Sequence, residues 1–206
     1  MKLELLAFPF RLIFRPFHCF WELKYENKGR LKIAYGILFI LVIAEILRRQ
    51  YAGFLVNYED PRFLNSIDEL KFIVFPFFLW CVSNWSLTAL MDGEGKFTEI
   101  MMATGYAVMP LVLVYLPNTL VSNFMNGQEV AFYYFFNLIA MGWFLWLAFV
   151  GMMTIHQYTP GKTIVTMLLT VVVIGIILFL GLLFFSLIQQ VIFFFQTIYR
   201  EIIFWS

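Results

Sequence analysis

The chain has 206 residues, of which 62% are hydrophobic and only 13% are charged, and its formal net charge is +1. A soluble domain carries about 25% charged residues, and a soluble fold of this length could not bury so much apolar side chain. The composition therefore predicts an integral membrane protein, and the near-neutral charge excludes a protein built to bind nucleic acid, which needs a clustered basic surface.

The leading segment, residues 1–30, mixes large apolar side chains with basic ones and is interrupted by Pro9 and Pro16. These interruptions are too frequent for a cleavable signal peptide. We expect the segment to lie along the cytoplasmic membrane face, with Trp21 and Tyr25 at the level of the lipid headgroups.

Five stretches are apolar over enough length to cross the hydrocarbon core, which takes about 20 helical residues. They are predicted at about 31–49, 70–91, 100–122, 129–155 and 163–186. The third stretch contains Pro110 and Pro117, which should kink it. The expected fold class is therefore all-α, a polytopic membrane protein with about five transmembrane helices in residues 31–186.

The apolar sequence continues past residue 186 without a turn signal. A single helix from Thr163 to Tyr199 would be on the order of 55 Å long, against roughly 30 Å of hydrocarbon. Polar residues recur at helical spacing in this region: Ser186, Gln189, Gln190, Thr197, Arg200 and Glu201. We expect residues 187–206 to form an amphipathic tail at the outer membrane surface, so that interfacial helices lie at both ends of the chain. Two short re-entrant pieces are the alternative.

Lysine and arginine residues indicate the orientation, because cytoplasmic segments carry an excess of them. Seven lie in the leading segment or at the start of the first span, and the connectors near Lys96 and Lys162 belong to the same side. The opposite side has five, including Arg62. We expect the amino terminus in the cytoplasm and the carboxyl terminus outside.

A short charged turn, MDGEGKFTEI at 91–100, separates the second and third spans. Its glycines, Gly93 and Gly95, permit a tight turn. From the residues alone, the turn is interpreted as a connector that fixes topology. A docking site for a partner is the alternative.

The segment DGEGKFTEIMMATGYAVMPLVL resembles the central signature of the Yip1 domain family. In that family a glycine turn with a basic residue and Phe precedes a span that carries Gly-Tyr and, four residues later, Pro. The matching residues are Gly93, Gly95, Lys96, Phe97, Gly105, Tyr106 and Pro110. The connector HQYTPGKT, with His156, Tyr158 and Lys162, also resembles a segment of this family, as does the leading RPFHCFWELKYENKGR.

For prokaryotic members the resemblance implies membership of the family rather than a defined activity. We interpret the chain as a non-enzymatic membrane module without a cofactor. Eukaryotic members engage prenylated Rab-type GTPases and carry a cytosolic Asp-Leu-Tyr-Gly-Pro motif, which this sequence lacks. We therefore expect a bacterial or archaeal plasma-membrane protein that acts as a scaffold or accessory subunit for other integral membrane proteins. Subunits of an ABC-type transport or export complex are the kind of partner expected, and a homo-oligomer is another form that the assembly could take.

The residues offer little catalytic or ligand chemistry. PGKT at 160–163 resembles the end of a phosphate-binding loop, but the pattern needs glycine at position 156 and finds His156. Two histidines and two cysteines are too few and too dispersed for a metal site. No catalytic set or disulfide framework is predicted. We expect His156 to be a solvated residue at the membrane interface.

Three polar or ionisable residues are predicted within the spans or close to their ends: Glu45, Asn84 and Asn118. Glu45 should form a local salt bridge with Arg48 or Arg49. Asn84 and Asn118 should hydrogen-bond to neighbouring helices, because an unpaired amide is costly in lipid. The alternative is that both asparagines line the path of an oligomeric small-solute transporter or channel subunit.

Overall fold

The computed structural model describes residues 2–57 and 65–204. Arg62 and Ser206 lie outside the described residues. The elements are α1 (Lys2–Phe14), α2 (Pro16–Tyr25), α3 (Leu31–Tyr51), α4 (Ser66–Leu90), α5 (Phe97–Ala107), α6 (Met109–Val121), the 3-10 turn η2 (Ser122–Phe124), α7 (Val130–His156) and α8 (Pro160–Phe204). The described residues contain no strand, so the predicted all-α class is confirmed.

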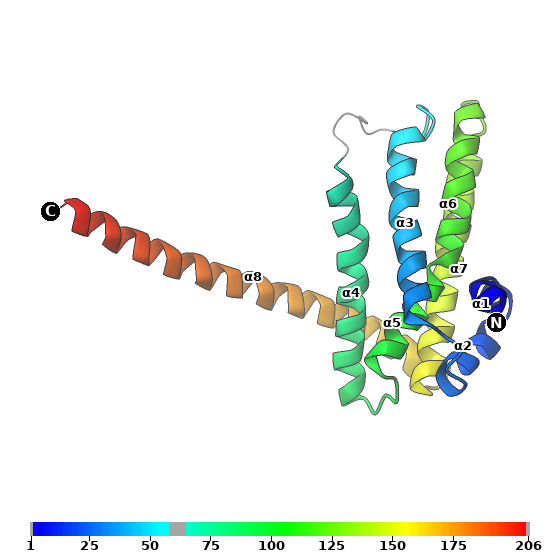
Figure 1. The fold of residues 1–206 in the computed structure, drawn as a ribbon, viewed down its shortest axis with the longest axis horizontal. Helices are drawn as coiled ribbons and strands as arrows, with labels where there is room; N and C mark the ends of the chain where they lie inside the picture. The colour runs from blue at the N-terminus through cyan, green and yellow to red at the C-terminus, as the bar shows by residue number, and fades with distance from the viewer. Residues whose placement is uncertain (1, 58–64, 205–206) are drawn as a thin grey trace.

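Figure 1 shows α3, α4, α6 and α7 standing side by side, with α5 at the lower end of the bundle. Among the described residues, four helical segments are long and apolar enough to cross a membrane: Ser66–Leu90, Phe97–Phe124, Val130–His156 and Pro160–Glu201. Helix α3 has 21 residues, which gives a length of about 32 Å, and its charged residues lie near its two ends. It packs on α4, α5 and α6. The chain is thus a multi-pass membrane protein with about five spanning helices.

The third predicted span is interrupted, as its prolines indicated. Helix α5 ends at Ala107 and α6 begins at Met109. Pro110 lies in the first turn of α6, where its missing N–H would have had no partner inside the helix. Pro117 lies inside α6. The kink predicted at Pro110 corresponds to this break between α5 and α6, whereas at Pro117 the structure has one continuous helix.

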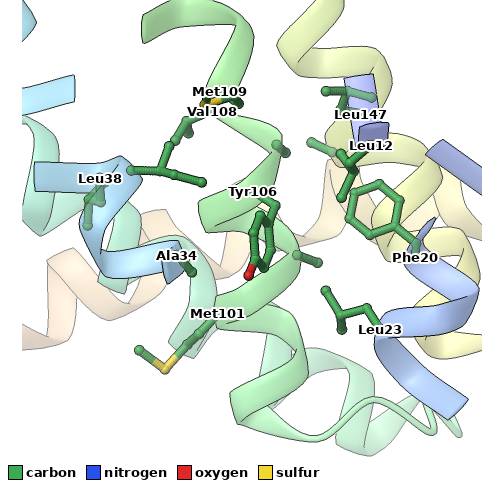
Figure 2. Packing of buried hydrophobic residues seen from close by; sticks show 14 of the residues in the cluster. Leu12, Phe20, Leu23, Ala34, Leu38, Met101, Tyr106, Val108, Met109 and Leu147 are labelled. Atoms are coloured by element: carbon green, nitrogen blue, oxygen red, sulfur yellow. The ribbon is translucent and has the colours of Figure 1, made fainter. Parts of the chain in front are cut away.

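The N-terminal segment forms two helices that add to the core of the bundle. Pro16 begins α2, whereas Pro9 lies within α1. Leu12, Phe20 and Leu23 are buried and point toward the bundle beside Leu147 and Tyr106 (Figure 2). This contribution to the core was not expected from a segment interpreted as lying along the membrane.

Helix α8 runs without a break through the position where a surface tail was predicted to begin. It is a single helix of 45 residues, so the re-entrant alternative is wrong. Its first turns pack on α4 and α7. Among its described residues none beyond Thr170 is buried, and Figure 1 shows the helix running sideways away from the bundle. A tail at the membrane surface from residue 187 stays a prediction.

Candidate functional site

Two connectors singled out by the sequence lie together at one end of the bundle. Residues 91–96 link α4 to α5, and residues 157–159 link α7 to α8. We call this end, at the bottom of Figure 1, the motif end. Here Gly93 and Gly95 lie against the side chains of His156 and Tyr158.

A line of hydrogen bonds crosses the motif end through His156. The N–H of Gly95 donates to His156 Nδ1 at 3.3 Å. Because Nδ1 accepts, the neutral ring carries its proton on Nε2, which donates to Asn84 Oδ1 at 3.1 Å. Asn84 Nδ2 donates to Thr170 Oγ1 at 3.2 Å, and the Thr170 hydroxyl donates to the carbonyl of Thr166. The line therefore ties the motif turn to α7, α4 and α8.

The expectation that His156 is solvated is wrong. His156 is only 1% exposed, because the motif turn covers its ring. The ring stacks on Tyr158 with 5.3 Å between centroids, and the Tyr158 hydroxyl donates to the carbonyl of Met91 at 2.9 Å. Burial, followed by the negative charge of Asp92, raises the pKa of Tyr158. Lys162 Nζ lies 4.3 Å from the centroid of the Tyr158 ring, a distance that allows a cation–π contact.

The two glycines of the turn are required for space. A Cβ on Gly93 would lie 2.7 Å from His156 Nδ1 and from the Tyr158 hydroxyl oxygen. A Cβ on Gly95 would lie 2.6 Å from His156 Cε1. Neither glycine has a positive φ, whereas Asp92 does, at 53°. The sequence-based explanation, conformational freedom in a tight turn, is therefore corrected to close approach of the backbone to the histidine ring.

Lys96 and Phe97 follow the turn and differ in their surroundings. Lys96 is the N-cap of α5, and its backbone N–H donates to Glu99 Oε2 at 3.1 Å. Its side chain is exposed. The Phe97 ring is half-buried and meets the edge of Trp85 with 5.7 Å between centroids. Lys96 thus presents charge at the surface, whereas Phe97 packs between α5 and α4.

Gly105, Tyr106 and Pro110 belong to the core and lie apart from the His156 network. A Cβ on Gly105 would be 2.7 Å from Ala34 Cβ, so this glycine permits the close approach of α5 to α3. Tyr106 is fully buried. Its hydroxyl accepts from the N–H of Arg30 at 3.1 Å and donates to the carbonyl of the same residue at 3.2 Å. These bonds fix the start of α3. Pro110 is buried at the start of α6.

Lys24 joins the motif end from the N-terminal segment, although no sequence signal indicated it. Its side chain is only 10% exposed. Lys24 Nζ donates to the carbonyl of Ile155 at 2.6 Å and to Glu94 Oε2 at 3.0 Å. The hydrogen bond from Lys24 is the main cause that lowers the pKa of Glu94. Helix α2 is thereby attached both to the end of α7 and to the motif turn.

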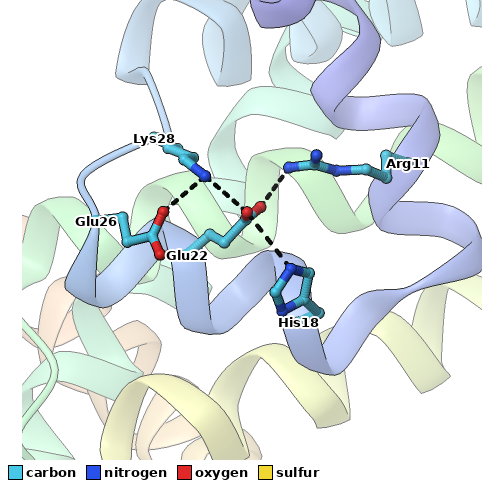
Figure 3. Close-up of polar contacts among 5 residues, drawn as sticks. All are labelled: Arg11, His18, Glu22, Glu26 and Lys28. Carbon is cyan, nitrogen blue, oxygen red and sulfur yellow. Dashed lines mark hydrogen bonds and ion pairs between the residues drawn. The ribbon is translucent and has the colours of Figure 1, made fainter.

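A second ionic cluster, shown in Figure 3, holds α1 and α2 together around Glu22. The Glu22 side chain is 5% exposed and pairs with Arg11, with Lys28 Nζ at 2.8 Å and with His18 Nε2 at 3.5 Å. Burial works to raise the pKa of Glu22, but the hydrogen bond from Lys28 and the charge of Arg11 outweigh it and leave the pKa below its ordinary value. The carboxylate is therefore ionised and serves as a clamp within the N-terminal segment.

The predicted polar groups of the spans have the partners expected for structural roles. Glu45 Oε2 accepts from Arg48 Nε at 2.6 Å, which confirms the local salt bridge. Asn118 Nδ2 donates to the carbonyl of Tyr133 and to Asn137 Oδ1, both at 3.0 Å and both on α7. Together with the bonds of Asn84, these contacts confirm hydrogen bonding between helices.

Within residues 2–57 and 65–204, no three His, Cys, Asp or Glu side chains are grouped so as to hold a metal ion. His156 accepts from a backbone N–H and donates to an amide, so neither ring nitrogen is directed toward open space. The arrangement joins helices and connectors.

Comparison with known proteins agrees with the resemblance seen in the motifs. The family model described as the Yip1 domain matches residues 10–183. The match takes in the motif turn, the second connector and the first half of α8. No curated protein sequence and no solved structure matches the chain significantly.

Proposed function

Because the chain belongs to the Yip1 domain family, we propose that it is a non-enzymatic scaffold or accessory subunit that binds other integral membrane proteins through its motif end. One observation carries the proposal: the motif turn is locked from inside by His156, while its charged residues Asp92, Glu94 and Lys96 are exposed on the outside. A rigid backbone that presents fixed charges suits recognition, because little ordering entropy is lost on binding.

The proposed partners are subunits of an ABC-type transport or export complex. The other form of assembly is a homo-oligomer, in which the partner is a second copy of the chain. Interfacial charges mainly set specificity and association rate. The mixed signs of Asp92, Glu94 and Lys96 favour a protein partner with a complementary charge pattern. The interhelical bonds of Asn84 and Asn118 favour this role over a solute path.

The docking role predicts that Lys96→Glu reduces partner recovery about tenfold, which corresponds to about 1.4 kcal/mol. Lys96 is exposed, so the substitution should leave the fold intact. The measurement is co-purification from native membranes in mild detergent, with quantitative mass spectrometry of the recovered proteins.

Lys71→Glu is the matched control, since Lys71 is also exposed but lies near the start of α4, at the opposite end of the bundle. Its ion pair with Asp68 is a surface pair of small energetic value. Recovery should be normal in this control. Unchanged recovery with Lys96→Glu, or an equal loss in both variants, would show that the motif end is not the docking face.

We infer that the motif end faces the cytoplasm of a bacterial or archaeal cell and that the protein lies in the plasma membrane. Gly127→Cys and Gly161→Cys test the orientation, because a Cβ at either position meets nothing within 4 Å. The native Cys19 and Cys81 are buried and should contribute little background. A membrane-impermeant maleimide should label Gly127→Cys in intact cells and Gly161→Cys only after lysis. Labelling of Gly161→Cys from outside would reverse the orientation.

A further inference from the structure

A cavity of about 440 Å³ lies within the bundle, away from the motif end. Its walls come from six helices, represented by Leu41 of α3, Trp80 of α4, Thr104 of α5, Leu111 of α6, Ala148 of α7 and Met167 of α8. Pockets that hold small ligands commonly have volumes of about 300–1,000 Å³. The cavity therefore has room for a ligand.

The lining of this cavity is suited only to an apolar ligand. Among the described residues that line the cavity, none is charged and only Thr104 has a hydroxyl group. That hydroxyl already donates to the carbonyl of Ile100 at 2.9 Å. The indole N–H of Trp80 is the other polar side-chain group in this lining, and a buried water needs two to four polar partners. Water and polar solutes are thus poor occupants, whereas a hydrocarbon chain gives up no hydrogen bond on entering.

The cavity is continuous with the surface that faces lipid. Phe72, Met141 and Leu145 line it and are also exposed, at 69%, 42% and 53%. They belong to α4 and α7, two of the helices able to cross the membrane. Along α4 the lining runs from Phe72 to Trp80, a rise of about 12 Å. This length is close to the roughly 15 Å that one leaflet contributes to the hydrocarbon core.

We propose that this cavity binds one acyl chain of a membrane phospholipid. The chain enters from the bilayer between α4 and α7 and contacts Met167 and Ile174 of α8, which also line the cavity. The bound lipid connects α8 to the rest of the bundle. It adds to the hydrogen bond between Asn84 of α4 and Thr170 of α8, which lies nearer the motif end. The site is independent of the docking role proposed above.

The test compares variants that fill the cavity with a matched control. Ala148→Phe places a ring in the inner wall, where Ala148 is only 5% exposed. Met141→Trp places bulk at the half-exposed rim, where the fold should tolerate it. Leu138→Trp is the control, because Leu138 lies on the same helix one turn away, is 69% exposed and does not line the cavity. Melting in detergent confirms that each variant is folded.

Each protein is reconstituted in phosphatidylglycerol vesicles, purified in mild detergent and examined by native mass spectrometry. Wild type and Leu138→Trp should retain a single phospholipid per chain, and the two filled variants should lose it about tenfold, as expected when a side chain takes the volume of the ligand. A phosphatidylglycerol with a diazirine in one acyl chain should label Trp80 or Met141 in wild type, and this labelling should fall in the same two variants.

Three outcomes would overturn the proposal. In the first, a folded Met141→Trp retains lipid as well as the control does. In the second, wild type retains no phospholipid and the diazirine labels only exposed positions of α8. In the third, wild type is a lipid-free dimer that the filled variants dissociate, which would make a second copy of the chain the occupant.

Discussion

Replacing Gly95 by alanine is expected to destabilise the folded protein by about 1–3 kcal/mol, the range observed when extra carbon atoms are forced into a packed interior. The new Cβ would lie 2.6 Å from His156 Cε1 and 2.6 Å from Ile155 Cγ2. To relieve this overlap, the turn must move away from His156, which lengthens the hydrogen bond from the Gly95 N–H. Equilibrium unfolding in detergent micelles measures the loss.

Gly142→Ala provides the control for this substitution. Gly142 lies on α7, the helix that also ends in His156, and a Cβ there meets nothing within 4 Å. Because alanine is the better helix former, the control should be neutral or stabilising by up to about 1 kcal/mol. Equal stability of Gly95→Ala and Gly142→Ala would show that the turn is not packed against the histidine.

Features that depend on local sequence could be predicted. The interruption near Pro110 follows from the missing N–H of proline, which acts within one helical turn. The Glu45–Arg48 salt bridge joins residues three positions apart, which lie on the same face of α3. It was predictable that Asn84 and Asn118 would each have a hydrogen-bond partner, since an amide in lipid needs one. The identity of each partner was not predictable.

Features that depend on distant segments could not be predicted from one sequence. Gly95 and His156 are 61 residues apart, and Lys24 is 131 residues from the carbonyl that it contacts. His156 follows a span and precedes a connector, a position typical of solvated residues, so its burial depends entirely on where the motif turn lies. Similarly, Lys24 and Glu22 look like residues of an amphipathic surface helix until α1, α2 and α7 are placed together.

The second large effect is expected from removing the side-chain groups that join α7 to α4. His156→Phe keeps a ring beside Tyr158 but removes both nitrogens, which leaves the Gly95 N–H and Asn84 Oδ1 without their partner. A buried polar group without a partner costs about 1–3 kcal/mol. Asn84→Leu similarly leaves His156 Nε2 and Thr170 Oγ1 without the amide. Each single variant should therefore be destabilised by about 1–3 kcal/mol.

That His156 joins the motif turn to the bundle through Asn84 is tested most directly by combining the two substitutions in a double-mutant cycle. The measured quantity is the free energy of unfolding of wild type, His156→Phe, Asn84→Leu and the double variant in the same detergent. If the hydrogen bond couples the two side chains, the double variant should lose about 0.5–1.7 kcal/mol less than the sum of the single losses. If the loss in the double variant equals the sum of the two single losses to within about 0.3 kcal/mol, His156 and Asn84 are not coupled. That result would contradict the hydrogen-bonded connection and, with it, the rigid motif end on which the docking role depends.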